Sequence, residues 1–203
     1  MSAADVGTPR STDWEAQYRA NDTPWDHGEP APGLVDFLAA HPDLERGQVV
    51  VPGCGFGHDA RAWSLAGFEA VGIDLAPSAT AAATALTPGG SKVEFRTGDF
   101  LRDIPVRPFR WMFEHTLFCA IDPAMRRDYA TSAGRWVAPG GWLLAVHYLD
   151  PAAPEGPPHR CERAELLGLF GGDFELLEEW VPRSWEKRAG REGMFWWRRR
   201  VSA

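Results

Sequence analysis

The stretch VVVPGCGFGHDA, residues 49–60, joins three consecutive valines to a turn in which glycine stands at every second position. A run of β-branched residues predicts a buried strand, and glycines directly after a strand let backbone amides approach a ligand that side chains would hold away. In the dinucleotide-binding fingerprint the third glycine follows the second by three residues. Here Gly57 follows Gly55 by two, so the spacing favours a ligand other than a dinucleotide.

The turn belongs to a predicted β-α-β unit, with a strand over 48–53, a helix over 58–67 and a second strand over 68–74. Asp74 ends the second strand, at the position where a carboxylate can accept hydrogen bonds from two ribose hydroxyls. The alternative is that the glycines only permit a tight turn and that Asp74 caps the next helix. If the turn and the acid instead bind a nucleoside, Gly53 and Asp74 contact the same ligand.

Strands and helices continue to alternate along the rest of the chain. We expect helices over 33–41, 77–86, 122–137 and 162–170, and strands over 92–99, 109–118, 140–149, 173–181 and 192–200. The last two strands are joined by a loop too short for a helical crossover, so they form an antiparallel hairpin. The sequence predicts an α/β fold: a Rossmann-like, doubly wound sheet of about seven strands, mostly parallel with a C-terminal antiparallel hairpin.

A third polar element, GDF at residues 98–100, ends the strand over 92–99. Asp99 can face an adenine amine and the Phe100 ring can lie along the base edge. A glycine turn, an acid after strand two and an acid after strand three form the layout of a class I methyltransferase that binds S-adenosylmethionine. A nicotinamide oxidoreductase is disfavoured by the glycine spacing, whereas a non-catalytic module that binds S-adenosylmethionine remains an alternative.

The segment before residue 33 is polar but carries three large aromatic residues, Trp14, Tyr18 and Trp25. Thr12 and Glu15 have the spacing of a capping box, which predicts a helix over 13–20. Aromatic rings in a polar segment favour a lid over a bound ligand, and the alternative is ordinary core packing. We treat residues 1–203 as a single domain in which residues 1–32 form the lid.

Composition excludes several classes of protein. The chain has 203 residues, 44% of them hydrophobic, and a net charge of −7, which disfavours nucleic acid as a partner. No leader pattern or apolar run long enough for a membrane span is present. Cys54, Cys119 and Cys161 fit neither a disulfide framework nor a zinc site, so we expect a cytoplasmic protein without a metal, as a monomer or homodimer.

Several motifs taken in order resemble the thiopurine S-methyltransferase superfamily, most closely its halide and thiol methyltransferase branch. They are WEAQY (14–18), TPWDHGEPAPGL (23–34), VPGCGFGHDA (51–60), GIDLAPSA (72–79), GDF (98–100), FEHTLFCAIDPAMRRDYA (113–130), PGGWLLAV (139–146) and GPPH (156–159). The resemblance covers the chain from Trp14 to about Arg191. It implies a site for S-adenosylmethionine made by Trp14, Trp25, Gly53, Asp74, Asp99, Phe100 and His115, next to Gly55 of the turn.

The chain departs from the plant members of this branch at three positions. His115 stands where a tyrosine is usual, His159 ends GPPH where a tyrosine or phenylalanine is usual, and Tyr18 stands where a second tryptophan is often found. The change at His159 bears on the acceptor, because the resemblance places that loop at the border of the acceptor pocket.

The chemistry implied by this resemblance needs little from the protein. A sulfonium methyl group is already activated, so alignment of a nucleophile and exclusion of water suffice, without a metal. His115 could accept a proton from a thiol or could be a buried histidine bonded to backbone, and His159 could touch an acceptor or lie on the surface. Cys119 is expected to be inert. The predicted reaction is methyl transfer to a small thiol, sulfide, thiocyanate or halide; the alternative acceptor is a larger oxygen, nitrogen or sulfur group in a natural-product pathway.

Overall fold

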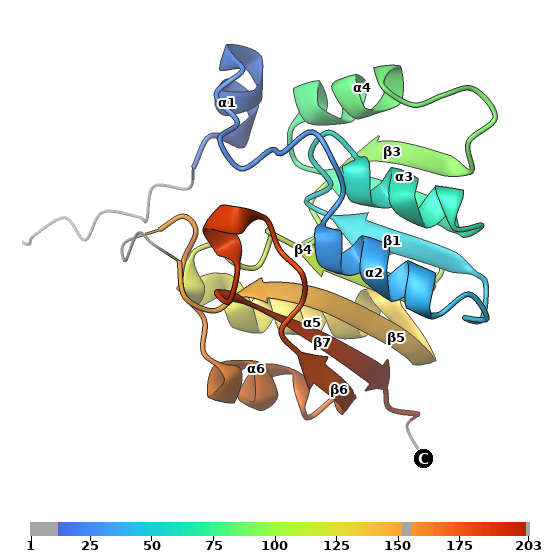
Figure 1. Ribbon diagram of the computed structural model, residues 1–203, viewed down its shortest axis with the longest axis vertical. Coiled ribbons are helices and arrows are strands. Elements are labelled where there is room, and N and C mark those ends of the chain that lie inside the picture. The colour runs from blue at the N-terminus through green and yellow to red at the C-terminus, as the bar shows by residue number, and fades with distance from the viewer. Residues whose placement is uncertain (1–11, 152–155, 202–203) are drawn as a thin grey trace, which may run out of the picture.

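The computed structural model describes residues 12–151 and 156–201 and contains one seven-stranded sheet (Figure 1). The strands are β1 (Gln48–Pro52), β2 (Glu69–Asp74), β3 (Val93–Thr97), β4 (Phe109–His115), β5 (Val137–Tyr148), β6 (Phe174–Trp180) and β7 (Glu192–Arg199). Their order is β3-β2-β1-β4-β5-β7-β6, with β7 antiparallel to both neighbours and the other pairs parallel. The predicted doubly wound sheet with a C-terminal antiparallel hairpin is confirmed.

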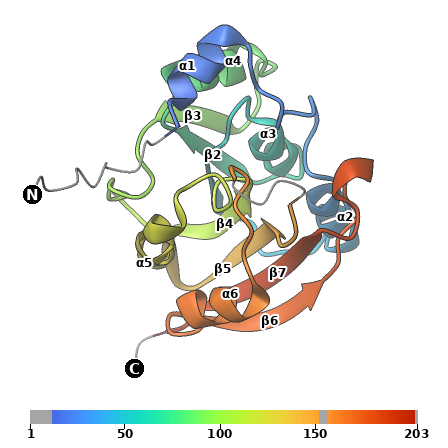
Figure 2. The ribbon, with the colours of Figure 1, turned by 90° about the vertical axis from the view of Figure 1, so that its left-hand side faces the viewer.

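Helices cover both faces of this sheet (Figures 1 and 2). The helices are α1 (Trp14–Ala20), α2 (Pro32–Ala40), α3 (His58–Leu65), α4 (Pro77–Ala85), α5 (Arg126–Trp136) and α6 (Arg163–Phe170), with 3₁₀ turns η1 (Pro123–Met125) and η2 (Glu186–Arg188). Helices α2, α3 and α4 lie on one face, and α5 and α6 lie on the other. None of the helices within residues 12–151 and 156–201 is long and apolar enough to cross a membrane.

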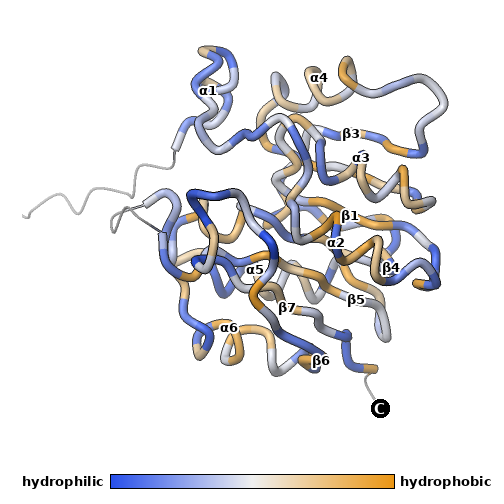
Figure 3. Tube along the Cα trace, in the orientation of Figure 1, coloured by the Kyte–Doolittle hydropathy of each residue, from blue (hydrophilic) through white to orange (hydrophobic). Residues whose placement is uncertain are grey.

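The valine run of β1 supplies both cores of the protein. Val49 and Val51 join the core under α2 and α3, whereas Val50 joins the core under α5 and α6, because successive side chains of a strand point to opposite faces. All three are at most 2% exposed, and burying each contributes about 2 kcal/mol. Figure 3 shows β1 as apolar, in contrast to the mostly polar α1. A strand buried on both faces explains why its sequence does not alternate.

The start of α1 differs from the predicted capping box. Asp13 is the N-cap, and its carboxylate accepts a hydrogen bond from the amide of Ala16 at 2.9 Å. Glu15 instead accepts from the hydroxyl and the amide of Ser78 on α4, at 2.7 and 3.0 Å. The prediction of a Thr12 to Glu15 box was therefore wrong, because Glu15 forms a long-range contact that holds α1 against α4.

The fourth strand is shorter than predicted and ends at His115. The chain turns at Thr116, which adopts a positive φ of 68°, and the amide of Phe118 donates to the carboxylate of Glu114 at 2.8 Å. Glu114 is 1% exposed and also accepts a hydrogen bond from the hydroxyl of Tyr129. Burial raises the pKa of Glu114 to about 7, although both hydrogen bonds oppose this shift.

The raised pKa of Glu114 predicts a specific dependence of stability on pH. The folded state holds the Glu114 proton more tightly than the unfolded state does. The protonated side chain therefore contributes fully to the free energy of unfolding below the ordinary pKa of 4.5, and this contribution is lost as the pH rises through 7. Between pH 5 and pH 8 we expect Glu114→Gln to lose less free energy of unfolding than the wild type, by on the order of 2–3 kcal/mol. Urea unfolding at the two pH values measures this difference. Glu175→Gln, at an exposed position on β6, is the control and should follow the wild type; the same behaviour from Glu114→Gln would contradict the assignment.

Candidate functional site

The carboxyl ends of β1, β2, β3 and β4 meet at one edge of the sheet, which Figure 2 faces. Gly53, Asp74, Asp99 and His115 lie at or directly after these four strand ends. In open α/β sheets ligands bind in the crevice outside this edge. Helix α1 lies beside α4 near the same edge, as Figures 1 and 2 show, so the parts that the sequence predicted to form a site are brought together.

The glycine turn is confined from two sides. Gly53, Gly55 and Gly57 all adopt left-handed conformations, with φ of 61°, 51° and 78°. A Cβ atom on Gly53 would lie 2.9 Å from Leu117 in the segment after β4, and one on Gly55 would lie 2.8 Å from the Tyr18 hydroxyl oxygen. Only glycine meets both demands, the positive φ and the close approach, so this turn presents bare backbone.

Asp74 connects the glycine turn to the start of α4. One carboxylate oxygen accepts a hydrogen bond from the amide of Gly55 at 2.9 Å, and the other accepts from the amide of Ala76 at 2.9 Å. Asp74 is 7% exposed, and burial raises its pKa, against the opposing effect of these two amides. Asp74 thus holds Ala76, the N-cap residue of α4, although among the described residues no side-chain hydrogen bond caps the helix itself. A ribose contact is compatible with these hydrogen bonds, because each carboxylate oxygen has a second lone pair.

Asp99 and Phe100 have different environments. The Asp99 carboxylate accepts from the amide of Leu101 at 2.9 Å, and its side chain is about one quarter exposed. The ring of Phe100 is 4% exposed and packs against Tyr129 and Trp136 in the core under α5. The structure therefore corrects the expectation that this ring lies along a base edge: β3 ends at Thr97, and in the turn that follows the ring packs against Tyr129 and Trp136 in the core.

The three aromatic residues of the predicted lid contact one another above the glycine turn. Trp25 lies edge-on to both Trp14 and Tyr18, with ring centroids 5.3 and 5.8 Å apart, and Tyr18 lies edge-on to Phe56 of the turn at 5.3 Å. Tyr18 is buried, whereas Trp14 and Trp25 are half-buried. These edge-to-face contacts fix the N-terminal segment to the turn.

His115 is held by a residue that the sequence analysis did not select. Its Nδ1 lies 2.9 Å from one carboxylate oxygen of Asp59, on the first turn of α3. The other oxygen of Asp59 accepts from the amide of Ala31 at 2.7 Å. Asp59 follows the glycine turn directly, but its partner is 56 residues away, and only the parallel pairing of β1 with β4 brings the two together.

Two further residues missed by the sequence analysis form a stack beside His115. Trp185 stacks on His27 with centroids 3.9 Å apart and on His115 with centroids 5.6 Å apart. The indole NH of Trp185 donates to Glu29 at 2.8 Å. Burial and the nearby Arg188 guanidinium lower the pKa of His27. Trp185 comes from the loop between β6 and β7, and nothing in its local sequence signals this placement.

His58 and Arg61, for which the sequence offered no function, hold neighbouring segments to α3. His58 lies 3.2 Å from the carboxylate of Asp26, and Arg61 donates to the carbonyl of Phe56 in the glycine turn at 2.7 Å.

His159 is half-exposed, and its amide donates to the carbonyl of Cys119. Residues 152–155 of the proline-rich loop lie outside the described residues, whereas Gly156, next to His159 in space, is described. Burial raises the pKa of Cys119 to about 12, which keeps the thiol protonated. Cys54, Cys119 and Cys161 are free, and the described residues contain no group of three or more His, Cys, Asp or Glu side chains arranged to hold a metal.

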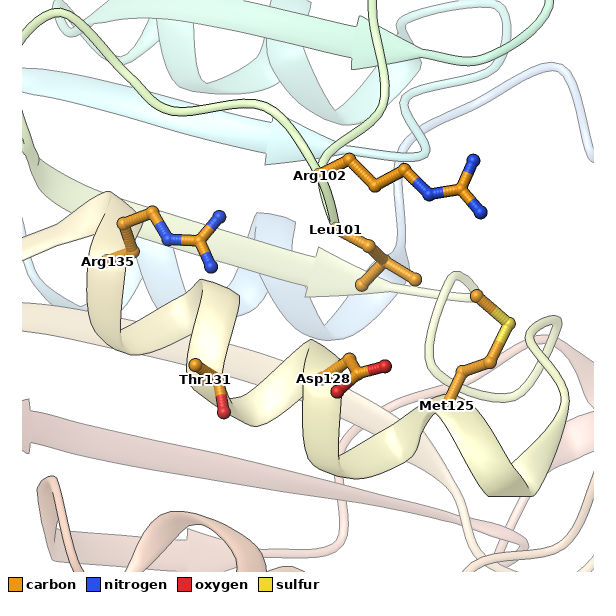
Figure 4. Close-up of a pocket in the computed structure, with 6 residues that line it drawn as sticks. All are labelled: Leu101, Arg102, Met125, Asp128, Thr131 and Arg135. Carbon is orange, nitrogen blue, oxygen red and sulfur yellow. The ribbon is translucent and has the colours of Figure 1, made fainter.

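Two surface hollows lie away from His115. One, of about 160 Å³, lies between the segment after β3 and α5 (Figure 4), where Leu101 and Arg102 face Met125, Asp128, Thr131 and Arg135. It is smaller than the roughly 300 Å³ at which ligand pockets begin. The other, of about 420 Å³, extends under the loop over 103–107, against β2 and β3. Neither contains the glycine turn or Asp74, so neither defines the site.

The approach of Tyr18 to Gly55 can be tested with a double-mutant cycle. Gly55→Ala costs about 1–2 kcal/mol for the left-handed conformation, plus the displacement of the Tyr18 hydroxyl, which lies 2.8 Å from the new Cβ. In a Tyr18→Phe background the second part disappears, because the next ring atom is 3.9 Å away. Urea unfolding of the four proteins, with hydrogen exchange of the amides over 14–25, measures the coupling. If the changes in the free energy of unfolding are strictly additive, the Tyr18 hydroxyl does not pack against Gly55.

Comparisons with known proteins agree with this geometry. Residues 10–201 match the family described as thiopurine S-methyltransferase (TPMT). The chain is 32% identical to thiocyanate methyltransferase 1 of Arabidopsis thaliana over 192 residues, covering 92% of this chain and 84% of that protein. It is 31% identical to probable thiol methyltransferase 2 of the same plant, covering 75% of this chain and 68% of that protein.

A solved structure from a study of the conversion of a disulfide bond into a thioacetal group during echinomycin biosynthesis has the same fold. It superimposes with a TM-score of 0.75 at 23% identity and covers 93% of this chain and 92% of that one. The family match, the two plant relatives and the glycine turn with its following acids lead to the same conclusion: this chain belongs to the thiopurine S-methyltransferase family of S-adenosylmethionine-dependent methyltransferases.

Proposed function

We propose that this methyltransferase transfers a methyl group to a small sulfur or halide nucleophile, beneath a lid formed by residues 12–32; residues 1–11 of the predicted lid lie outside the described residues. The observation that carries the proposal is the convergence of Gly55, Asp74 and Tyr18 at the carboxyl edge of the sheet, where Tyr18 covers the glycine turn. The names of the plant relatives, a thiocyanate and a probable thiol methyltransferase, support acceptors of this size.

The site fits S-adenosylmethionine on structural grounds. The turn at Gly53 and Gly55 leaves room for no side chain, so its backbone is free to follow a nucleoside. Asp74 supplies the acceptor for ribose hydroxyls, and Asp99 supplies an acceptor toward an adenine amine. When bound, S-adenosylmethionine supplies an electrophilic methyl group on a sulfonium.

The aromatic residues suit a positively charged ligand. Ring faces attract cations by about 0.5–2 kcal/mol, and the lid limits the access of water to the acceptor. Trp14 and Trp25, half-buried above Tyr18, are the rings available for this purpose. His115 lies at the end of the neighbouring strand β4, and we assign it to the pocket with them. His159 borders the acceptor side in this proposal.

We also propose a cytoplasmic location and a monomer or homodimer. Three free cysteines support a reducing compartment. The net charge of −7 argues against nucleic acid as a partner.

The lid predicts that Trp25→Ala weakens the binding of S-adenosylmethionine by at least about ten-fold, or about 1.4 kcal/mol, with a smaller loss of folding stability. The indole belongs to a small cluster with Tyr18, Phe56, Ala76 and Ala79 that is separate from the two cores, so its removal leaves both cores intact. Calorimetric titration and urea unfolding measure the two effects. Trp142→Ala is the matched control: this half-buried tryptophan of β5 stacks on Trp111, four residues before the carboxyl end of β4, and its loss should reduce stability without changing affinity. Equal losses of affinity in both variants would contradict the lid.

The acceptor class is tested by a headspace assay for volatile methylated products, with S-adenosylhomocysteine quantified in parallel. Purified protein is supplied with S-adenosylmethionine and, in turn, iodide, bromide, thiocyanate, sulfide, methanethiol and an aromatic thiol. We expect turnover of at least one of these acceptors. If none of these acceptors is turned over while calorimetry confirms binding of S-adenosylmethionine, the proposal is overturned in favour of a larger acceptor or a binding module.

A further inference from the structure

The carboxylate of Asp59 is shared between two donors on different segments. One oxygen accepts from the amide of Ala31, at the end of the proposed lid, and the other lies 2.9 Å from Nδ1 of His115. A carboxylate can only accept hydrogen bonds, so Nδ1 carries the proton. In a neutral imidazole the other nitrogen, Nε2, then has a free lone pair.

This lone pair is buried and has no partner. Nε2 of His115 makes no hydrogen bond to any described residue, and the side chain is 9% exposed. Buried polar atoms are rarely left without a partner, and those that are need an explanation, such as a role in catalysis. The ring lies at the carboxyl end of β4, adjacent to β1 and its glycine turn. The position is that of a proton acceptor at the ligand edge of the sheet.

The surroundings enclose the ring without supplying a partner to Nε2. Trp185 covers one face, with an interplanar angle of 27°. The titratable groups that act on His115 are Asp59 on α3, Glu114 on β4 and His27 in the lid. His27 in turn lies near Asp26 in the lid, Arg188 on η2 and Glu192 on β7. Arg188 and Glu192 pair with each other at 3.3 Å. Asp59 is the group of this set that touches the imidazole.

We infer that Asp59 and His115 form a general-base pair that lets this protein methylate thiols in their protonated form. The inference rests on the proposed function and narrows its acceptor class. His115 is the catalytic base, and Asp59 is a positioning residue. As the S–H bond of the acceptor breaks, Nε2 takes the proton and the electron pair stays on sulfur. That pair forms the new bond to the methyl carbon, and the bond from this carbon to the sulfonium sulfur breaks with its electrons, leaving neutral S-adenosylhomocysteine. The imidazolium then releases its proton to solvent.

A base distinguishes thiols from the other acceptors. Iodide and thiocyanate are already anions and carry no proton to remove. A simple aliphatic thiol ionises near pH 8.5 or above, so at pH 7 roughly 3% of it or less is thiolate. Without the base the protein can methylate only the thiolate fraction, so we expect the turnover of an aliphatic thiol at pH 7 to fall by about 30-fold or more. An aromatic thiol is more acidic and should lose less.

The experiment compares His115→Gln and Asp59→Asn with the wild type on methanethiol, thiophenol, thiocyanate and iodide, from pH 6.5 to 9.5. We expect His115→Gln to lower turnover of methanethiol relative to thiocyanate by at least about 30-fold at pH 7. This loss should shrink as the pH rises and should be smaller for thiophenol. Asp59→Asn should lower the same ratio by about ten-fold, since the imidazole remains but is no longer held as one tautomer.

The chain offers a matched control. Asp26 and His58 form a second histidine–carboxylate pair, 3.2 Å apart, that also joins the segment before α2 to α3. Asp26→Asn and His58→Gln should leave the ratio of methanethiol to thiocyanate turnover within two-fold of wild type at every pH. A loss of the ratio in these variants equal to that in His115→Gln would overturn the proposal, because the effect would then come from the lid alone.

A second readout does not depend on turnover. The ¹⁵N spectrum of the His115 ring should show a protonated Nδ1 and a bare Nε2 in the wild type, and a mixture of tautomers in Asp59→Asn. A protonated Nε2 in the wild type would overturn the pair.

Failure of the inference is distinguishable from failure of the proposed function. Turnover of anions without any thiol, or an equal loss on methanethiol and thiocyanate in His115→Gln, would overturn the base and leave the methyltransferase assignment standing. If the wild type binds S-adenosylmethionine but turns over none of the acceptors, both the proposed acceptor class and the general base are overturned.

Discussion

The two hydrogen bonds accepted by Asp74 are the constraint on which the ligand edge depends. They tie the turn after β1 to the turn after β2, and they keep Gly55 in the left-handed conformation against which Tyr18 packs. Removing the carboxylate would leave the amide of Gly55 and the amide of Ala76, the residue before α4, without their acceptor. Asp74 therefore serves the fold as well as the ribose contact that we propose for it, so its replacement by alanine should also disturb the turn that it helps to shape.

Buried polar groups in this protein differ in how well they are compensated. Asp74 and Glu114 each face two donors, which oppose the rise in their pKa values caused by burial. His147 is buried with both ring nitrogens unpartnered among the described residues, and burial together with Arg126 lowers its pKa to about 3. The histidine stays neutral there because a charged imidazolium, buried in an apolar environment without a partner, has a high free energy and gives up its proton. His115 differs from His147 in having a carboxylate at Nδ1.

Much of the fold follows from local sequence. The valine run, the glycine turn and the alternation of strands with helices predict the parallel sheet, because these signals occupy consecutive residues. The spacing of Gly55 and Asp74 similarly places both at one edge. The sequence could not give the direction of the Phe100 ring, because this residue lies in a turn after the end of β3 and its contact with Tyr129 comes from α5, 29 residues further along the chain.

The contacts around His115 could not be read from the sequence at all. Asp59 of α3 and Trp185 of the loop before β7 contact this residue, and Trp185 also stacks on His27 of the lid, more than 150 residues away along the chain. Such contacts depend on the sheet order, which brings β4 next to β1 and places β7 beyond β5. A polar residue in the first turn of a helix, such as Asp59, looks locally like a favourable interaction with the helix dipole. Only the tertiary structure shows that both of its oxygens are engaged elsewhere.

The sharing of Asp59 connects water exclusion to acid–base chemistry. The amide of Ala31 ends the segment that covers the glycine turn, so a displaced lid would remove one of the two donors of this carboxylate. The remaining donor, His115, would then lose the second anchor that fixes the carboxylate relative to its ring. If the proposed lid and base share this carboxylate, they are ordered together. In such a site the proton acceptor is aligned only when the acceptor thiol is also shielded from water, which is the condition under which a thiolate is most reactive toward a sulfonium.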